Sequence, residues 1–405
     1  MKLMTLAVPF RLLQQAREAL LLVPFVGIAG FCFGLLRSVP RLPAPTAIRM
    51  ITDARGVAVP IDLPFRGVAL TWGFDVPGWY LEDTRAPESL VYAGDAEDRA
   101  RFSHSILRWI YPQVVANDKL WRAHVLDTAR GPYAEAESLL CYDASAFLGA
   151  PNGLLPLLRQ IGLPAVNMWS ANTGFENRNF TAIRVDSQLI DDVTRGQAYI
   201  ARYRRNLNRL EQDVQVSTLG SRPRGLGMIS PRGDGRRIFL YGRQSELSSF
   251  DFPRAGVVYA GAGATSLGAD AERVLAMDPD VIFLEGAQKA TIAPAQSPVE
   301  FRQDPRWRGL KAARENRVYS LPSVGDAGLI FTPIVIRWLA EVTHPERMLP
   351  SVRQELKDRM LEEFGYSLSE AQINGLLELY ENKNSAGYAR FAGGATNGSS
   401  PEGKR

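Results

Sequence analysis

The sequence predicts an α/β protein built from two lobes, each formed around a parallel sheet, with one long helix joining them. In both halves of the chain, short apolar runs alternate with helical patterns, as in parallel sheets that helices cover on both faces. A long polar-faced helical pattern without proline separates the halves. The stretch AEAESLLCYDASAFLGA also resembles DAERVLAMDPDVIFLEGA further on, which indicates two lobes built on one plan.

Composition narrows the class of protein. The chain has 405 residues, enough for two lobes, and a net charge of +4. Its basic residues are scattered rather than striped, so we expect no nucleic-acid partner, whereas an anionic ligand or surface is compatible with this charge. Two cysteines and three histidines, without a Cys-x-x-Cys pattern, leave little material for a metal site, and we predict none.

The N-terminus predicts export. Residues 19–36 form an uncharged apolar run after three basic residues, and a Pro-rich spacer follows to residue 47. The run is long for a signal peptide and just long enough to span a bilayer. A cleaved signal, an uncleaved anchor and a buried helix are all open, and we expect a periplasmic protein that residues 19–36 can tether to the inner membrane.

The N-terminal lobe is expected over residues 48–186. Its predicted strands are GVALTW, SLVYAG, SAFLGA and LPAVNMW, with the helix LLPLLRQIG between the last two. Residues 187–216 then read as one long helix whose many arginines indicate a solvated face. An ordinary surface helix and a stiff connector between lobes both fit this pattern, and the connector is the sharper hypothesis.

The C-terminal lobe is expected over residues 217–383. Its predicted strands are RGLGMIS, RRIFLYG, GVVYAG, DVIFLEG and NRVYSLP, and two helices follow over 334–341 and 351–364. Residues 384–405 are rich in Gly, Ser and Asn, so we predict a disordered tail there.

A family resemblance rests on several of these stretches. Glu272-x-x-Leu275-x-x-Asp278-Pro-Asp-Val-Ile resembles the signature of solute-binding proteins of ABC importers for iron-siderophore complexes, haem and cobalamin. The stretches ITDARGVAVPIDLPFRGVAL, DPRWRGLKAARENRVYSLP and RWLAEVTHPERM resemble the family's opening hairpin, a late helix-turn-strand and its closing helix. Together they cover most of residues 51–380 in the family's order, although CYDASAFL in the first lobe lacks the Pro-Asp pair.

The resemblance implies a binding protein rather than an enzyme. It implies a ligand cleft between the lobes, a monomer without a cofactor, and delivery of the ligand to an ABC permease in the inner membrane. We expect an iron complex, such as a siderophore-like chelate. Haem, cobalamin and molybdate-type oxyanions are the alternatives within the same fold.

Candidate ligand contacts follow from strand ends, because ligands of α/β lobes bind beyond the carboxyl ends of the strands. Aromatic rings offer flat apolar faces to a bulky chelate, and Arg offers paired hydrogen bonds to oxyanions. For each candidate, a role as an ordinary rim or core residue at a strand end fits the sequence about as well as a role in ligand binding. The predicted ligand-binding residues are Trp72, Trp169, Arg232, Tyr241, Arg243 and Glu285.

Two other classes of function stay open. An exported α/β enzyme would need clustered His residues or paired carboxylates, and the sequence contains no G-x-S-x-G or H-E-x-x-H motif, so we predict no catalytic residue. The glycine-rich stretch GAGATSLG lacks the third glycine of a dinucleotide-binding loop and predicts a tight turn. A sensor that keeps the binding fold with a degenerate cleft is the third hypothesis.

Overall fold

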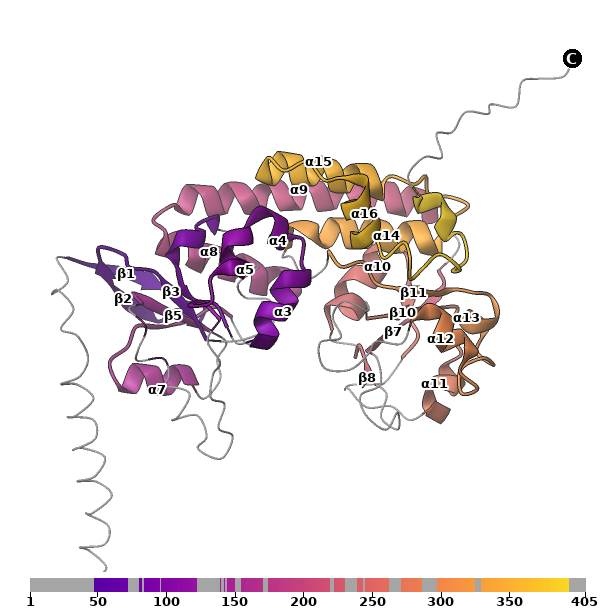
Figure 1. Ribbon diagram of the computed structural model, residues 1–405, viewed down its shortest axis with the longest axis horizontal. Helices are drawn as coiled ribbons and strands as arrows, with labels where there is room; N and C mark the ends of the chain where they lie inside the picture. The colour runs from indigo at the N-terminus through magenta and orange to yellow at the C-terminus, as the bar shows by residue number, and fades with distance from the viewer. Residues whose placement is uncertain are drawn as a thin grey trace, which may run out of the picture. The chain divides into compact units, whose positions relative to one another are not determined.

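The structure is a computed structural model (Figure 1). Contacts divide the chain into two units, Met1–Ala47 and Ile48–Arg405. The predicted apolar segment 19–36 lies outside the described residues, and no helix within them is both long and apolar enough to cross a bilayer. The described residues are 47–71, 80–81, 84–94, 96–121, 139, 142, 144–149, 154–169, 174–218, 222–229, 239–242, 245–261, 271–285, 297–324 and 329–392.

A four-stranded parallel sheet forms the centre of the N-terminal lobe. Its strands are β3 (Val68–Leu70), β4 (Leu90–Tyr92), β5 (Ala146–Gly149) and β6 (Ala165–Asn167), in the order β4-β3-β5-β6. Phe147 packs in one buried cluster and its neighbours Ala146 and Leu148 in another, so the sheet is covered on both faces. The predicted parallel sheet is therefore confirmed. The helical elements of the lobe are η1 (Pro87–Ser89), α3 (Ala96–His104), α4 (Leu107–Ile110), α5 (Pro112–Ala116) and α7 (Leu154–Gln160).

A hairpin of β1 (Ala47–Thr52) and β2 (Ala58–Leu63) precedes this sheet. The Asp53 carboxylate shapes its turn by accepting hydrogen bonds from the backbone N–H groups of Arg55 (2.8 Å) and Val57 (2.9 Å). Its other oxygen pairs with Arg159 on α7 at 2.6 Å, and the Asp53 side chain is fully buried. One aspartate therefore forms the turn and attaches the hairpin to the lobe.

Two consecutive helices, α8 (Phe175–Leu189) and α9 (Val193–Thr218), follow the first sheet. The sequence predicts one helix over 187–216, but the chain turns at Ile190–Asp192, where Asp191 has a φ of 61°. At 1.5 Å per residue the 26 residues of α9 span about 39 Å. Its buried stripe recurs every three or four residues and consists of Tyr199, Tyr203, Leu207, Leu210 and Val214.

The C-terminal lobe has a second sheet, of five strands. These are β7 (Arg224–Ile229), β8 (Phe239–Leu240), β9 (Val258–Tyr259), β10 (Val281–Leu284) and β11 (Val318–Ser320), in the order β11-β10-β7-β8, with β9 also pairing with β7. All pairs are parallel except β7 with β8. Along β10, Val281 and Phe283 face one buried cluster, while Ile282 and Leu284 face the other.

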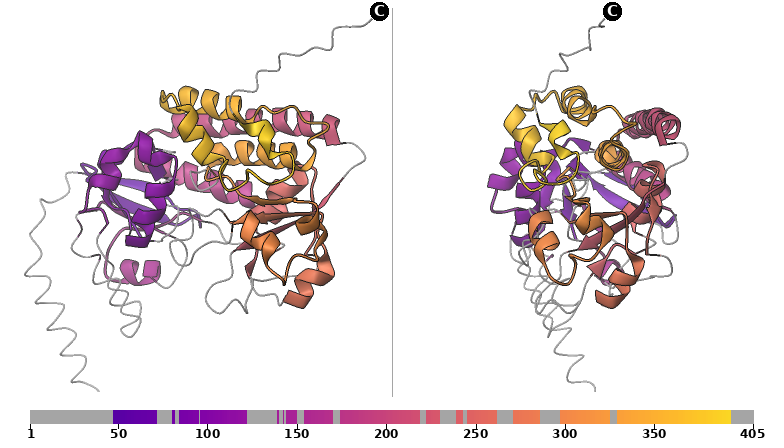
Figure 2. Two further views of the ribbon diagram at one scale, coloured as in Figure 1. Left: turned by 45° about the vertical axis from the view of Figure 1, so that its right-hand side comes forward. Right: turned by 90° about the vertical axis from the view of Figure 1, so that its right-hand side faces the viewer.

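Helices cover both faces of this second sheet (Figure 2). A π-helix, η2 (Leu247–Asp251), continues into α10 (Phe252–Arg254) and packs against β7 and α14 (Thr332–Thr343). The opposite face carries α11 (Ala271–Met277), α12 (Pro298–Gln303) and α13 (Lys311–Arg314). In the stretch AERVLAMDPDVIFLEGA, the residues AERVLAM form the helix α11 and VIFL form the buried strand β10.

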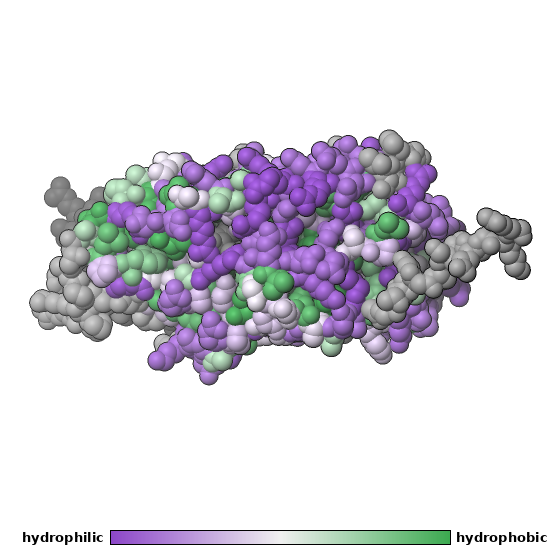
Figure 3. Space-filling model, turned by 90° about the horizontal axis from the view of Figure 1, so that it is seen from above, coloured by the Kyte–Doolittle hydropathy of each residue, from purple (hydrophilic) through white to green (hydrophobic). Residues whose placement is uncertain are grey.

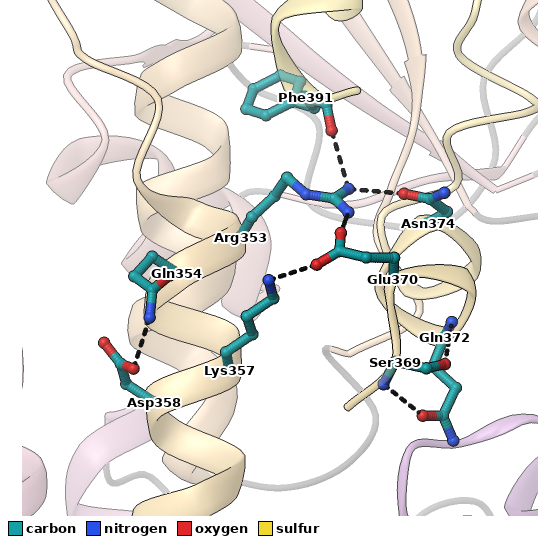
Figure 4. Close-up of polar contacts among 9 residues, drawn as sticks. All are labelled: Arg353, Gln354, Lys357, Asp358, Ser369, Glu370, Gln372, Asn374 and Phe391. Atoms are coloured by element: carbon teal, nitrogen blue, oxygen red, sulfur yellow. Dashed lines mark hydrogen bonds and ion pairs between the residues drawn. The ribbon is translucent and has the colours of Figure 1, made fainter. Parts of the chain in front are cut away.

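The C-terminal segment is η5 (Leu329–Phe331), α14, α15 (Val352–Phe364), α16 (Glu370–Leu376) and η6 (Tyr388–Phe391). Ser369 and Gln372 form a capping box at the start of α16, and Glu370 pairs with Arg353 and Lys357 of α15 (Figure 4). The predicted disordered tail was placed too early at residue 384. Tyr388 and Phe391 are buried and Trp338 donates a hydrogen bond to the Tyr388 hydroxyl at 2.9 Å, so residues 384–392 belong to the packed C-terminal segment.

Candidate functional site

Three of the six predicted ligand contacts fall within the described residues. Trp169 and Glu285 follow the carboxyl ends of β6 and β10, as the strand-end rule requires, and Tyr241 follows β8. Trp72, Arg232 and Arg243 lie outside the described residues. The ligand-binding role of all six stays a prediction.

Trp169 lies at the edge of the N-terminal sheet, beside the first turn of α8. The Arg178 guanidinium carbon is 4.8 Å from the centroid of the Trp169 ring and 5.6 Å from that of Phe175. These cation–π contacts hold the guanidinium near two aromatic rings, an arrangement that presents a fixed positive charge together with flat apolar surfaces.

Arg178 has no carboxylate partner within the described part of the chain. Its Nε is buried there without a hydrogen-bond partner, and the side chain as a whole is half-buried. An Arg that is partly removed from water and not neutralised by a neighbour favours an anion. The positive end of the α8 dipole acts in the same direction, and the carboxylate of Glu176 in the first turn offsets part of that effect.

Phe175 extends this cluster to the C-terminal lobe. Its ring centroid is 4.7 Å from that of Phe250 on the π-helix η2. The Arg254 guanidinium carbon lies 3.6 Å from the Phe250 ring centroid, and Arg254 pairs with Glu211 of α9 at 2.7 Å. The start of α8, the middle of α9 and the π-helix therefore meet around one phenylalanine, and π-helices often mark functional sites.

Burial raises the pKa values of two polar groups that pack near this cluster. Burial raises the pKa of the Asp251 carboxyl well above its ordinary value, and Arg254 offsets only part of that rise. Burial also raises the pKa of the Tyr203 hydroxyl, as do the carboxylates of Glu176, Asp251 and Glu246 to a smaller extent. Arg254 is paired with Glu211, so Arg178 is the arginine of the cluster without a carboxylate partner in the described part of the chain.

Tyr241 was selected on the premise that its strand is parallel, and that premise is wrong. β8 runs antiparallel to β7, so Tyr241 lies beside Gly227, whose carbonyl accepts its backbone N–H at 3.0 Å. The tyrosine is nevertheless close to the cluster, because Ser248 on η2 donates to the Tyr241 carbonyl at 3.1 Å. Its position therefore has a different cause from the one predicted.

Glu285 emerges from the edge of the second sheet. Its backbone N–H donates to the carbonyl of Met228 at 2.9 Å and its side chain is half-buried. Glu285 therefore lies at the carboxyl end of β10, the side of a parallel sheet on which ligands of α/β folds bind.

Strand-end reasoning missed the residues that build the cluster, namely Phe175, Arg178, Phe250 and Arg254. They lie at a helix start and on a π-helix, neither of which the strand-end rule examines. The available signals were an aromatic and an Arg in one turn, in FENR and again in FDFPR. Within the described residues, no group of three or more His, Cys, Asp or Glu side chains could hold a metal ion.

Comparison with known proteins identifies the fold. Residues 158–324 match the family model described as "Periplasmic binding protein", which confirms the resemblance seen in the sequence and describes binding proteins rather than enzymes. No curated protein sequence matches the chain.

Solved structures resemble this chain over most of its length. A periplasmic solute-binding protein from Veillonella parvula is 17% identical, with a TM-score of 0.64 over 83% of this chain and 99% of its own. Molybdate-bound MolA from Haemophilus influenzae is 14% identical, with a TM-score of 0.63 over 79% and 99%. Ni(II)-bound CeuE from Helicobacter pylori is 15% identical, with a TM-score of 0.60 over 81% and 99%. At these identities the likeness is one of fold.

Proposed function

We propose that this chain, which has the fold of periplasmic binding proteins, is the extracytoplasmic solute-binding component of an ABC importer. It performs no chemistry. It captures a small-molecule ligand between its lobes as a monomer and delivers it to the permease in the inner membrane. Residues 19–36 serve either as its export signal or as its tether.

The proposed ligand is an anionic iron chelate, and Arg178 is the observation that carries this proposal. A half-buried guanidinium without a carboxylate partner in the described part of the chain favours a ligand with negative charge. The rings of Trp169 and Phe175 beside it suit a ligand with flat, unsaturated groups. Ferric chelates built from catecholate or carboxylate groups combine these two properties.

The other predicted contacts have assigned roles in this proposal. Trp169 supplies a stacking surface from the N-terminal lobe, and Tyr241 and Glu285 supply polar contacts from the C-terminal lobe. Trp72, Arg232 and Arg243 complete the site as an aromatic face and two further cations. Haem, cobalamin and molybdate are the competing ligands, since proteins of this fold include molybdate-bound MolA and the haem-binding protein HmuT.

A ligand panel tests the proposal. The full-length protein is titrated with a ferric tris-catecholate, ferric citrate, a ferric hydroxamate, haem, cobalamin and molybdate, while tryptophan fluorescence and the melting temperature are followed. We expect a ferric chelate to quench fluorescence and to raise the melting temperature. Preference for haem, cobalamin or molybdate would reject the iron chelate, and the absence of any response would reject the binding function.

Arg204 on α9 provides a matched control for a substitution of Arg178. The Arg204 guanidinium carbon likewise lies over a phenylalanine ring, 4.7 Å from the Phe180 centroid, but outside the cluster. Replacing Arg178 by Gln is expected to weaken binding of the anionic chelate by about tenfold or more, since a charge-assisted contact is lost. Arg204→Gln should change the affinity by less than about twofold.

A further inference from the structure

A second connection between the lobes lies away from the aromatic cluster, at the end of α15. Glu363 is the penultimate residue of that helix, and its side chain is 2% exposed. Arg202 of α9 contacts both carboxylate oxygens, with Nε at 2.6 Å from Oε1 and Nη2 at 2.7 Å from Oε2. Arg85 of the N-terminal lobe donates to Oε2 at 2.8 Å. One buried carboxylate therefore joins three separate segments of the fold.

Arg85 contacts the end of α15 in a second way. Its guanidinium carbon lies 4.9 Å from the centroid of the Phe364 ring, and that ring stacks on Phe331 with centroids 6.3 Å apart. The backbone of Arg85 has a φ of 53°, a left-handed conformation that is costly for a residue with a Cβ. The fold thus retains an unfavourable backbone geometry at the residue that bridges to α15.

The opposite end of α15 is attached to the C-terminal helices. Glu341 of α14 accepts hydrogen bonds from the backbone N–H groups of Ser351 (2.8 Å) and Val352 (3.1 Å), at the helix start. Arg353 contacts Asn374 and the carbonyl of Phe391 (Figure 4). With 13 residues, α15 is a strut about 20 Å long that is fixed to different parts of the protein at its two ends.

The strut lies on the hydrophilic face that also carries α9 (Figure 3). The exposed charged side chains of α15 already make this face soluble, so solubility does not explain why Glu363 is buried. A buried carboxylate with arginine partners is costly to disrupt, because its removal leaves the half-buried guanidinium groups of Arg85 and Arg202 without their counter-ion. The ion pairs of Glu363 with Arg85 and Arg202 therefore resist displacement of α15 relative to Arg85.

We propose that Glu363 is a positioning residue for ligand binding, which through Arg85 and Arg202 braces the N-terminal lobe against α15 and α9 and so sets the separation of the two lobes. This inference rests on the proposed binding function. α15 acts as a second strut beside the connecting helix, and the ligand contacts of the two lobes stay in register because of it. Glu363 itself touches no ligand.

The brace is tested by measuring the distance between the lobes without ligand. Spin labels are placed on the full-length protein at exposed positions, Gln113→Cys in the N-terminal lobe and Arg308→Cys in the C-terminal lobe. Cys32 and Cys141 are replaced by Ser throughout. We expect a narrow distance distribution in the parent protein and a broad one after Glu363→Gln. Dissociation of the ferric chelate should be accelerated about fivefold or more by the same substitution.

The matched control is Glu370→Gln, which removes a carboxylate paired with two cations of α15 but within the C-terminal helices (Figure 4). It should leave both the distance distribution and the dissociation rate unchanged. If Glu363→Gln does not fold, Arg85→Gly decides instead, because glycine accepts the left-handed backbone while the bridging guanidinium is lost.

The outcomes separate the two proposals. A parent-like distance distribution in Glu363→Gln, or in Arg85→Gly where that variant decides, overturns the brace, and so does a broad distribution with unchanged ligand dissociation. If the parent protein binds no member of the panel, the proposed function fails, and the distance measurement still decides whether Glu363 braces the lobes.

Discussion

Phe175 at the start of α8 and Phe250 on the π-helix pack with their ring centroids 4.7 Å apart and their planes inclined by 50°. One ring follows the N-terminal sheet, and the other belongs to a segment that packs against the C-terminal sheet. The pair therefore joins the two lobes by a ring contact within the cluster of Phe175, Arg178, Phe250 and Arg254.

Truncation of Phe250 should impair both stability and binding. Phe250→Ala removes a buried ring, and we expect a loss of about 3–5 kcal/mol in the free energy of unfolding, measured by urea denaturation. Ligand affinity should also fall, because Phe175 and Arg254 lose their shared support. Phe391→Ala removes an equally buried ring in the C-terminal segment and should cost similar stability at unchanged affinity. Equal affinities in the two variants would contradict the prediction.

Glu341 predicts a pH dependence of stability. Burial raises the pKa of this carboxyl to about 7, although hydrogen bonds from Ser351 and the charge of Arg337 act in the opposite direction. Between an unfolded pKa near 4.5 and about 7, the native state holds a proton that the unfolded chain has released. The free energy of unfolding therefore falls as the pH rises through this window, by up to about 3 kcal/mol from this one group.

The amide variant isolates this effect. Glu341→Gln keeps an oxygen for the N–H groups of Ser351 and Val352 but does not titrate. Its stability should decline less steeply than that of the parent between pH 5 and 7, in urea denaturation at fixed ionic strength. Parallel pH profiles for the two proteins would show that Glu341 is already ionised at pH 5.

Alanine substitutions at two glycines, Gly227 and Gly375, should have opposite effects on stability. A Cβ at Gly227 of β7 would lie 2.5 Å from Leu247 and 2.8 Å from Tyr241, so Gly227→Ala should displace the π-helix and cost about 1–3 kcal/mol. Gly375 in α16 has open space around its Cα, and Gly375→Ala should raise stability by up to about 1 kcal/mol. Melting temperatures measure both, and a destabilised Gly375→Ala protein would argue against the described packing of α16.

Substitutions of Asp53 and Asp62 compare a buried with an exposed ion pair on the same hairpin. Asp53→Ala leaves Arg159 and two backbone N–H groups without their acceptor, and we expect a loss of about 3 kcal/mol by urea denaturation. Asp62 is 38% exposed and 3.4 Å from Arg66, so Asp62→Ala should change stability by less than about 1 kcal/mol. Similar losses in both variants would refute the central role of Asp53.

Most strands of the two sheets could be predicted, because a buried strand appears in the sequence as a short apolar run. Apolar runs such as VIFL and AFLG became β10 and β5, and their alternation between two cores explains why both runs are apolar throughout. The direction of β8 could not be predicted, since two residues of strand have the same pattern in either orientation. The order of the C-terminal segment was missed because Tyr388 and Phe391 are isolated among small polar residues, and only tertiary packing reveals their burial.

The site was less predictable than the fold. Trp169 and Glu285 follow strands, as the rule that selected them requires, and their ligand-binding role stays a prediction. Arg178 is singled out by two nearby aromatic rings and by the lack of a carboxylate partner in the described part of the chain. Spacing along the sequence does not encode that environment. The bond between Glu363 and Arg85 joins residues 278 positions apart, a distance over which a single sequence shows no pattern.

The two aspartates around Pro279 fix the amino end of β10, the end that lies away from the predicted ligand contact Glu285. Asp280 accepts the backbone N–H of Arg224 at 2.8 Å and pairs with Lys311 at 2.6 Å, while Asp278 accepts the N–H of Lys311 at 2.7 Å. These bonds lie at the amino end of β10, opposite to Glu285. A library aimed at the proposed ligand specificity can therefore keep this end of the sheet constant, together with its folding contacts, and vary only the far end, where Glu285 is a predicted ligand contact.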